Sequence, residues 1–247
     1  MTKERTPHDE LLASYDTTVL NHASSLEPLL REKGLLKGVR SLLSLGIGAG
    51  HLECSLARET GMKLSYVERS ESMIAAVEMN IASHGIEPCM VDRFHESFET
   101  ASITGTYDLV LSLDSWYHIG RSRATLEKAL RLRSPDGRLL IQLMSADRQL
   151  YWELDRVRGL ISSNDLHTWV LGERLTHEYF EHSHWTPLNN LISEDGPTDG
   201  FKHFVAFAMG VPWDYLSAVQ RDEAVRVVYD LQSGNRLETR HGYLLFV

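Results

Sequence analysis

The chain has 247 residues, with 25 Lys and Arg against 34 Asp and Glu, which gives a formal net charge of −9 when histidines are neutral. Nucleic-acid-binding proteins normally carry a basic face because phosphate neutralisation supplies most of their affinity, so this balance argues against a nucleic acid as partner. With 43% hydrophobic residues, 24% charged residues and 7 prolines, the composition is that of a globular protein with a buried core.

Two cysteines, Cys54 and Cys89, are too few for a disulfide framework and match no metal-ligand spacing, which predicts a reducing compartment. The polar start over residues 1–10 has no apolar stretch behind it that would make a signal peptide, and no window approaches the roughly 20 apolar residues of a spanning helix. The 12 histidines are scattered without HExxH spacing, so we predict no metal site. We therefore expect a cytoplasmic protein with no membrane partner; the oligomeric state stays open, with a monomer plausible.

The first elements in chain order are helical, and an alternating pattern follows. Apolar spacing predicts a helix over residues 11–20, and Ser24 to Glu27 resembles a capping box that opens a second helix ending at Gly34. Strands are then predicted at residues 39–45, 62–67, 89–92, 107–113 and 138–143. Helices are predicted from the glycines to about residue 60, at 71–83 and at 123–132, and a turn at 134–137. Strand and helix alternation with short turns indicates a mostly parallel sheet covered on both faces.

The last hundred residues are expected to be richer in helix and to cover the ligand cleft. Their predicted helices are at residues 148–160, 172–180, 198–207 and 215–231, and their strands at 184–191 and 242–247. No linker rich in Pro or Gly, no repeat and no low-complexity tract separates the halves, so we predict one domain over residues 1–247. Within it, residues 1–36 form the N-terminal helices, 37–145 the cofactor-binding core, and 146–247 the acceptor-side helices and closing strands.

A glycine-rich loop is the sharpest local signal. Gly46, Gly48 and Gly50 lie directly after a predicted strand and before a predicted helix, and His51 stands where a dinucleotide fingerprint has its third glycine. Glu68 follows Gly46 by 68 − 46 = 22 residues, at the end of the next strand, where a carboxylate can accept hydrogen bonds from ribose hydroxyls. No Lys or Arg accompanies the loop, which favours a nucleoside without phosphate; the structural alternative is a tight turn and a solvated glutamate.

With the loop, the Tyr66-Val67-Glu68 stretch, the strand at 107–113 and the run from Pro135 to Ile141, the chain resembles class-I S-adenosylmethionine-dependent methyltransferases. The resemblance implies an α/β, Rossmann-like, doubly wound seven-stranded sheet, mostly parallel with an antiparallel last strand, with N-terminal helices and a C-terminal helical cover. It also implies S-adenosyl-L-methionine as the cofactor and a small-molecule methyl acceptor as the partner. The cofactor-binding residues it implies are Gly46, Ile47, Gly48, Gly50, Glu68, Ser97 and Leu113.

Most such enzymes have an acidic residue two positions before the first glycine, where this chain has Ser44. In this respect the chain is similar to the histamine N-methyltransferase family, whose equivalent strand reads Leu-Ser-Ile before its glycines. Further matches follow in order along the chain: Asn21-His22, Asp114 to Tyr117, Asn164 to His167, Asp199, and Leu244 to Val247. This resemblance implies methyl transfer to a nitrogen of a small imidazole or amine.

Candidate acceptor residues follow the fourth strand, because ligands in open α/β sheets lie beyond the carboxyl ends of the strands. A Gln and two Tyr of the family fall on Asp114, Tyr117 and His118, and its pocket cysteine falls on His167, so these four are the catalytic candidates. The substrate-binding candidates are Asn21, Trp116, Tyr151, Trp152, Phe204 and Arg240.

Two departures from the family pattern bear on the acceptor. The glutamate that holds the substrate ammonium in the family falls on Ser25, with Glu27 two positions away, and an asparagine near its last strand falls on about Arg240. An Arg240 side chain in the pocket would favour an acceptor with a carboxylate, such as an amino acid related to histidine. The structural alternatives are a helix-capping Glu27, a core aromatic Trp116 and a surface His167.

The sequence is compatible with three functions. A neutral nitrogen has an available lone pair and needs no obligatory base, and the Asp114 carboxylate could stabilise the charge it gains, with help from the Trp116 and Tyr117 faces. An O-methyltransferase of a natural-product pathway would instead need His118 or His167 as a base. The third possibility is a protein that binds the cofactor without catalysis.

Overall fold

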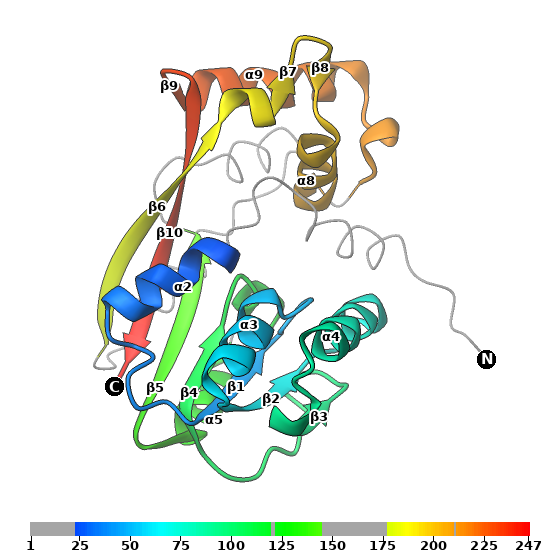
Figure 1. The fold of residues 1–247 in the computed structure, drawn as a ribbon. Helices are drawn as coiled ribbons and strands as arrows, with labels where there is room; N and C mark the ends of the chain where they lie inside the picture. Colours follow the sequence, from blue (N-terminus) through cyan, green and yellow to red (C-terminus); the bar gives the residue numbers. More distant parts are fainter. Residues whose placement is uncertain (1–22, 120–121, 145–176, 210) are drawn as a thin grey trace, which may run out of the picture. The chain divides into compact units, whose positions relative to one another are not determined.

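The computed structural model describes residues 23–119, 122–144, 177–209 and 211–247 (Figure 1). The chain divides into two compact units, which are described separately. Residues 22–143, 171–180 and 242–247 make up one, here called the core unit, and residues 1–21, 144–170 and 181–241 make up the other, here called the second unit.

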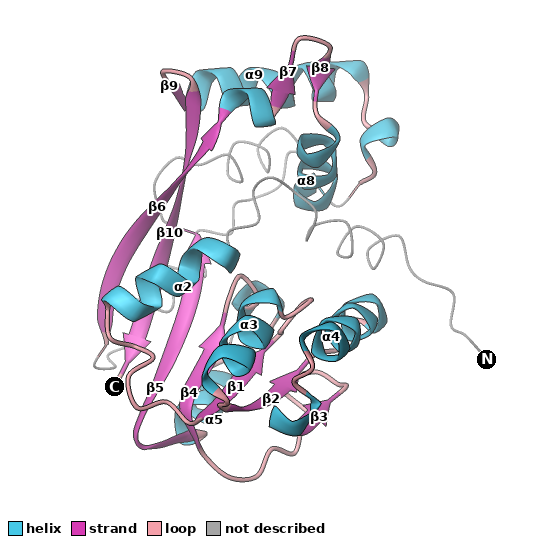
Figure 2. Ribbon diagram, viewed as in Figure 1, coloured by secondary structure: helices cyan, strands magenta, loops and turns pink. Residues whose placement is uncertain are grey.

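The central sheet has the strand order β3-β2-β1-β4-β5-β10-β6, and the short β9 pairs with β10. Its strands are β1 (Ser41–Leu45), β2 (Lys63–Val67), β3 (Met90–Phe94), β4 (Tyr107–Ser112), β5 (Arg133–Met144), β6 (Glu178–Pro187), β9 (Gln232–Ser233) and β10 (Arg236–Phe246). The pairs β1–β2, β1–β4, β2–β3 and β4–β5 are parallel, whereas the β10 arrow runs against its neighbours (Figure 2). The predicted Rossmann-like fold, with a seven-stranded path and an antiparallel last strand, is confirmed.

Both faces of the core-unit sheet are covered by helices, which are α2 (Ala23–Glu32), α3 (His51–Thr60), α4 (Glu71–His84) and α5 (Arg123–Arg131). Leu42 and Leu64 belong to one apolar cluster with buried residues of α2, α3 and α4. The alternate residues Leu43 and Val110 are fully buried as well, as expected for strands covered on both sides, and α5 lies on the opposite face (Figure 2).

At the amino ends of the strands, one carboxylate joins β1, β4 and β5. Asp108 Oδ2 accepts hydrogen bonds from the backbone N–H groups of Arg40 (2.8 Å) and Ser41 (3.1 Å), and Oδ1 accepts one from the Ser134 hydroxyl (3.3 Å). Burial alone would raise the pKa of Asp108, but these hydrogen bonds outweigh it and the pKa is lowered. Asp108 therefore stabilises this edge of the sheet by linking the starts of the three strands.

The predicted turn at residues 134–137 lies inside β5, so the prediction that the strand begins at Arg138 is wrong. Tyr107 pairs with Arg133 and Leu109 pairs with Arg138, which leaves residues 134–137 as an irregularity in the ladder. A Cβ on Gly137 would lie 2.6 Å from the carbonyl oxygen of Tyr107. The turn-forming composition therefore builds a bulge rather than a chain reversal.

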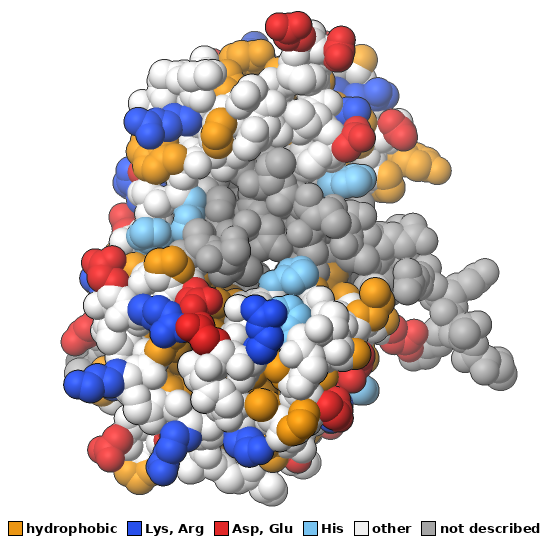
Figure 3. Space-filling view, viewed as in Figure 1, with side chains coloured by type: hydrophobic (Ala, Val, Ile, Leu, Met, Phe, Trp, Pro, Cys, Tyr) orange, Lys and Arg blue, Asp and Glu red, His pale blue; other side chains and the backbone are white. Residues whose placement is uncertain are grey.

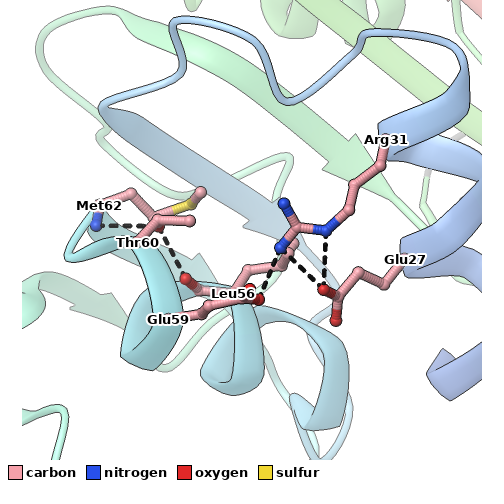
Figure 4. A network of polar contacts seen from close by, with 6 residues as sticks. All are labelled: Glu27, Arg31, Leu56, Glu59, Thr60 and Met62. Atoms are coloured by element: carbon pink, nitrogen blue, oxygen red, sulfur yellow. Dashed lines mark hydrogen bonds and ion pairs between the residues drawn. The ribbon is translucent and has the colours of Figure 1, made fainter.

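The helix α2 begins at Ala23, so the predicted cap at Ser24 is wrong. Glu27 is paired within the helix instead: its Oε1 accepts from Arg31 Nε (3.0 Å) and Nη2 (2.8 Å). Arg31 Nη2 also donates to Glu59 of α3 at 2.5 Å, so Arg31 links the two helices (Figure 4). The predicted helix at residues 11–20 lies outside the described residues.

The second unit contains the β7–β8 hairpin (Ile192–Ser193 and Gly196–Pro197), α8 (Asp199–Met209) and α9 (Ala218–Leu231). The helix α9 begins after Ser217, whose hydroxyl accepts from the Gln220 backbone N–H in a capping box, and so later than the predicted start at Tyr215. Side chains of α8 and α9 form one apolar core with Leu191, Leu216 and Leu237.

Other boundaries near β6 and β10 also differ from the prediction. The predicted helix at 172–180 is wrong at its end because β6 begins at Glu178, where Phe180, His182 and His184 alternate with the period of a strand. The strand predicted at 184–191 ends at Pro187, and β10 begins at Arg236 rather than Gly242. The predicted helix at 148–160 lies outside the described residues.

On the face drawn in Figure 3, basic and acidic side chains of the described residues are interspersed. In the described ranges, no helix is long and apolar enough to cross a membrane, and no three His, Cys, Asp or Glu side chains form a metal-binding group. Cys54 and Cys89 are both free thiols, and burial, with the charge of Glu53, raises the pKa of Cys54 to about 12.

Candidate functional site

The glycine loop between β1 and α3 needs glycine for two different reasons. Gly46, Gly48 and Gly50 all have positive φ (69°, 58° and 70°). A Cβ on Gly46 would lie 2.5 Å from Ser115 Cβ, and one on Gly50 would lie 2.8 Å from Val77 Cγ2. Among the described residues, a Cβ on Gly48 would meet only Met73 Sδ, at 3.9 Å. Gly46 and Gly50 therefore allow close packing, whereas the described residues leave space beside the backbone of Gly48 that a ligand could approach.

Glu68 is held beside this loop at the carboxyl end of β2. Its Oε2 accepts from the Gly48 backbone N–H (3.1 Å), and its Oε1 accepts from those of Arg69 (2.8 Å) and Ser70 (2.9 Å). The residue is 9% exposed, so the carboxylate is fixed in position before any ligand arrives. A fixed acceptor next to an open glycine backbone fits the hydroxyl groups of a ribose.

The helix α4 secures the far side of the loop. Asn80 Nδ2 donates to the backbone carbonyl of Ala49 (2.8 Å), and Val77 packs against Gly50. Nothing in the sequence pattern identified Asn80, because its position on α4 has meaning only once α4 lies against the loop.

A buried hydrogen-bonded pair lies at the carboxyl end of β1, and the sequence pattern did not predict it either. Ser44, at the position that is acidic in most class-I enzymes, donates to Glu53 Oε1 at 2.6 Å. Ser44 is 1% exposed and Glu53 is 4% exposed in the first turn of α3. A carboxylate therefore lies next to Ser44, supplied by the helix instead of the strand.

The segment after β4 lies against the same loop. Ser115 Oγ donates to the carbonyl of Leu45 (2.5 Å) and is 2.8 Å from Ser112 Oγ. Just before it, Asp114 has a φ of 50°, and its Oδ2 accepts from Gln142 Nε2 of β5 at 2.8 Å. The structure thus brings Asp114 to the edge of the sheet that carries the glycine loop and Glu68.

Most of the remaining cofactor candidates also follow strand ends of the core unit. Ile47 is buried in the loop, and Leu113 is half-buried directly after β4. Ser97 is half-buried in the segment after β3, with its hydroxyl 3.1 Å from Thr100 Oγ1. Parallel strands place these segments at one edge of the sheet.

The acceptor candidates are less tightly grouped. Trp116 is fully buried, as in the core-aromatic alternative, and His118 is exposed two residues later. Phe204 is buried in the second-unit core, and Arg240 of the same unit donates to both carboxylate oxygens of Glu238 (3.2 Å each). Four candidates, and the Tyr117 side chain, lie outside what the structure describes: Asn21, Tyr151, Trp152 and His167.

Comparison with known proteins places the chain in a family. A family model described as a methyltransferase domain matches residues 21–192. The mitochondrial ubiquinone biosynthesis O-methyltransferase of Schizosaccharomyces pombe is 25% identical over 117 residues, which are 47% of this chain and 42% of that protein. The chain thus matches less than half the length of this curated relative.

Solved structures agree on the fold. A S-adenosylmethionine-dependent methyltransferase of Thiobacillus denitrificans, solved with S-adenosylhomocysteine, has a TM-score of 0.55 at 13% identity, covering 91% of this chain and 90% of that one. Coclaurine N-methyltransferase, solved with N-methylheliamine and S-adenosylhomocysteine, has a TM-score of 0.58 at 16% identity, covering 91% and 72%. The family model covers well over half of the chain, so the chain belongs to the methyltransferase-domain family, and the solved structures share its fold.

Proposed function

We propose that the chain transfers a methyl group from S-adenosyl-L-methionine to a nitrogen of a small imidazole or amine related to histamine or histidine. The observation that carries this proposal is the Asp114 carboxylate, held by Gln142 at the carboxyl end of β4 and next to the glycine loop. A nitrogen acceptor gains positive charge in the reaction, and a fixed carboxylate stabilises such charge. An oxygen acceptor would instead need a base to remove its proton.

The core unit would hold the cofactor through groups already in place. Glu68 would accept hydrogen bonds from the ribose hydroxyls, and Gly48 would let the nucleoside approach the backbone. When bound, S-adenosylmethionine supplies an electrophilic methyl group, so the task of the protein is to orient the acceptor and exclude water.

Within this proposal an acceptor without a carboxylate is favoured. Arg240 was the candidate for binding an acceptor carboxylate, but its guanidinium is paired with Glu238 on the same strand. An amine or imidazole lacking an acidic group, closer to histamine than to histidine, suits Asp114 better. The roles of Trp116, Tyr117 and Phe204, and those of Asn21, Tyr151, Trp152 and His167, stay predictions.

A second candidate function is O-methylation, which the name of the Schizosaccharomyces pombe relative favours. His118, exposed at the end of the turn after β4, would then act as the base. In that case His118→Ala should lose most of the transfer rate while S-adenosylhomocysteine binding stays at the wild-type level.

The test is a labelled-methyl assay of the full chain on a panel of imidazoles, amines, phenols and carboxylates, with mass spectrometry and NMR to locate the methyl group. We expect N-methylated product, and a rate on it that falls about tenfold to a hundredfold in Asp114→Asn. Transfer to oxygen alone would contradict the proposal. We further propose, as the sequence predicts, that residues 1–247 act as one domain in the cytoplasm.

A further inference from the structure

Asp114 has an unusual backbone conformation at the edge of the candidate site. Its φ of 50° is the only positive φ of a non-glycine residue in the described part of the chain. Residues other than glycine rarely adopt a positive φ. Those that do are concentrated at functional sites, where surrounding contacts hold the strained backbone in place. This bend turns the chain out of β4 and presents Asp114 at the carboxyl edge of the sheet.

Neighbouring strands surround this one carboxylate. Ser112 of β4 pairs with Ile141 of β5, so the next residue, Gln142, reaches the same edge, where its Nε2 donates to Asp114 Oδ2 at 2.8 Å. Gln142 is 4% exposed, so its amide is fixed by burial. On β10, the next strand, Tyr243 is 1% exposed; burial first, and then the charge of Asp114, raises the pKa of its phenol.

The position of Asp114 relative to the glycine loop indicates what it faces. The strands β2, β1 and β4 are neighbours in that order, and they lead into Glu68, the glycine loop and Asp114 respectively. A nucleoside whose ribose is held at Glu68 and which extends across the loop would bring its sulfur end toward β4. The sulfur of S-adenosylmethionine is positively charged, whereas that of the product S-adenosylhomocysteine is neutral.

We propose that Gln142 is a positioning residue that holds the Asp114 carboxylate toward the charged sulfonium end of the cofactor. The site then binds the cationic methyl donor more tightly than the neutral product. This inference rests on cofactor binding at this edge, but not on the identity of the acceptor, because it concerns the two forms of the cofactor alone.

The test compares ligands that differ in charge at this one place. Sinefungin carries an amine-bearing carbon in place of the methylsulfonium group, so it is cationic where S-adenosylhomocysteine is neutral. The dissociation constants of both, and of S-adenosylmethionine, would be measured by titration calorimetry on wild type, Asp114→Asn, Gln142→Met and the double variant. The readout is each protein's preference, the Kd of S-adenosylhomocysteine divided by that of the cationic ligand.

We expect a clear wild-type preference for the cationic ligands, which falls about tenfold in Asp114→Asn. Gln142→Met should lower it about threefold to tenfold. Because Gln142 acts through Asp114, adding Gln142→Met to Asp114→Asn should have no further effect. Asp108→Asn, which removes a carboxylate at the opposite edge, should leave the preference unchanged.

Three results would overturn the proposal. An unchanged preference in Asp114→Asn would mean that the carboxylate does not face the sulfonium. A preference that Gln142→Met leaves intact would mean that Gln142 has only a packing role, since lost packing weakens all ligands alike. A preference that Gln142→Met lowers equally with and without the Asp114 carboxylate would mean that Gln142 acts on the ligand independently of Asp114. No acceptor is present in these titrations, so failure of the N-methylation proposal would leave their outcome unaffected.

Discussion

The two edges of the core-unit sheet each hold a carboxylate that accepts backbone hydrogen bonds, and we propose different roles for the two. At the amino edge, Asp108 accepts from Arg40, Ser41 and Ser134. At the carboxyl edge, Glu68 accepts from the backbone N–H groups of Gly48, Arg69 and Ser70. The number of hydrogen bonds therefore does not distinguish the structural carboxylate of Asp108 from the proposed ligand-binding carboxylate of Glu68.

The surroundings separate them. The groups around Asp108 belong to the starts of three strands, and the adjacent bulge is closed so tightly that a Cβ on Gly137 would lie 2.6 Å from a carbonyl oxygen. Beside Glu68, the position of a Cβ on Gly48 has a single neighbour in the part of the chain that the structure describes, Met73 Sδ at 3.9 Å. A fixed carboxylate beside open backbone is suited to a ligand, whereas one within closed backbone stabilises the fold.

The largest effect is expected from Gly46→Ala in the loop. The substitution combines the strain of a φ of 69° with a clash against Ser115, and should cost about 2–4 kcal/mol of unfolding free energy and abolish S-adenosylhomocysteine binding. Gly61→Ala is the matched control: its φ is 70°, but nothing lies within 4 Å, so only about 1 kcal/mol and no affinity should be lost. Urea denaturation and calorimetry measure both; equal losses in the two variants would contradict the role of close packing.

Asp108→Asn should cost about 1–2 kcal/mol at neutral pH without changing cofactor affinity. The folded-state pKa of Asp108 is lowered, so its contribution is fully present above the ordinary aspartate pKa of about 4 and is lost as the pH falls through the lowered value. The difference in unfolding free energy between wild type and variant should therefore shrink in acid. A difference that is constant from pH 7 to pH 2.5 would argue against a stabilising role for the ionised Asp108 carboxylate.

Asn80→Ala should have the smallest effect, a loss of about threefold to tenfold in S-adenosylhomocysteine affinity, because the amide holds the loop through a single backbone carbonyl, that of Ala49. Ser83→Ala on the same helix is the control, since its hydroxyl bonds only back to the helix carbonyl of Asn80. If both variants bind as wild type does, the loop does not depend on this hydrogen bond.

The carboxyl edge could be predicted from sequence because its signals are local. Gly46 to Gly50 and Glu68 each follow a strand of clear apolar pattern, and the parallel sheet then fixes where they meet. Hydrogen bonds between different helices and strands leave no comparable local pattern in the sequence. Asn80, Gln142 and the Ser44–Glu53 pair acquire meaning only when helices and strands pack together.

At the amino edge, the residue types were interpreted correctly but the structure that they form was not predicted. The turn residues at 134–137 were identified by type, but the sequence did not reveal that a register shift against Tyr107 would accommodate them inside β5. Likewise, the alternation of Phe180, His182 and His184 over a short segment competes with a helical pattern, and pairing within the sheet decides in favour of the strand.

The central claim is that the carboxyl edge binds the cofactor through Glu68 while the similar carboxylate at the amino edge does not. Its most direct test is the Kd of S-adenosylhomocysteine for wild type, Glu68→Gln and Asp108→Asn, measured by calorimetry in one buffer. We predict a loss of about tenfold to a hundredfold for Glu68→Gln and less than about twofold for Asp108→Asn. Wild-type affinity in Glu68→Gln, or an equal loss in both variants, would contradict it.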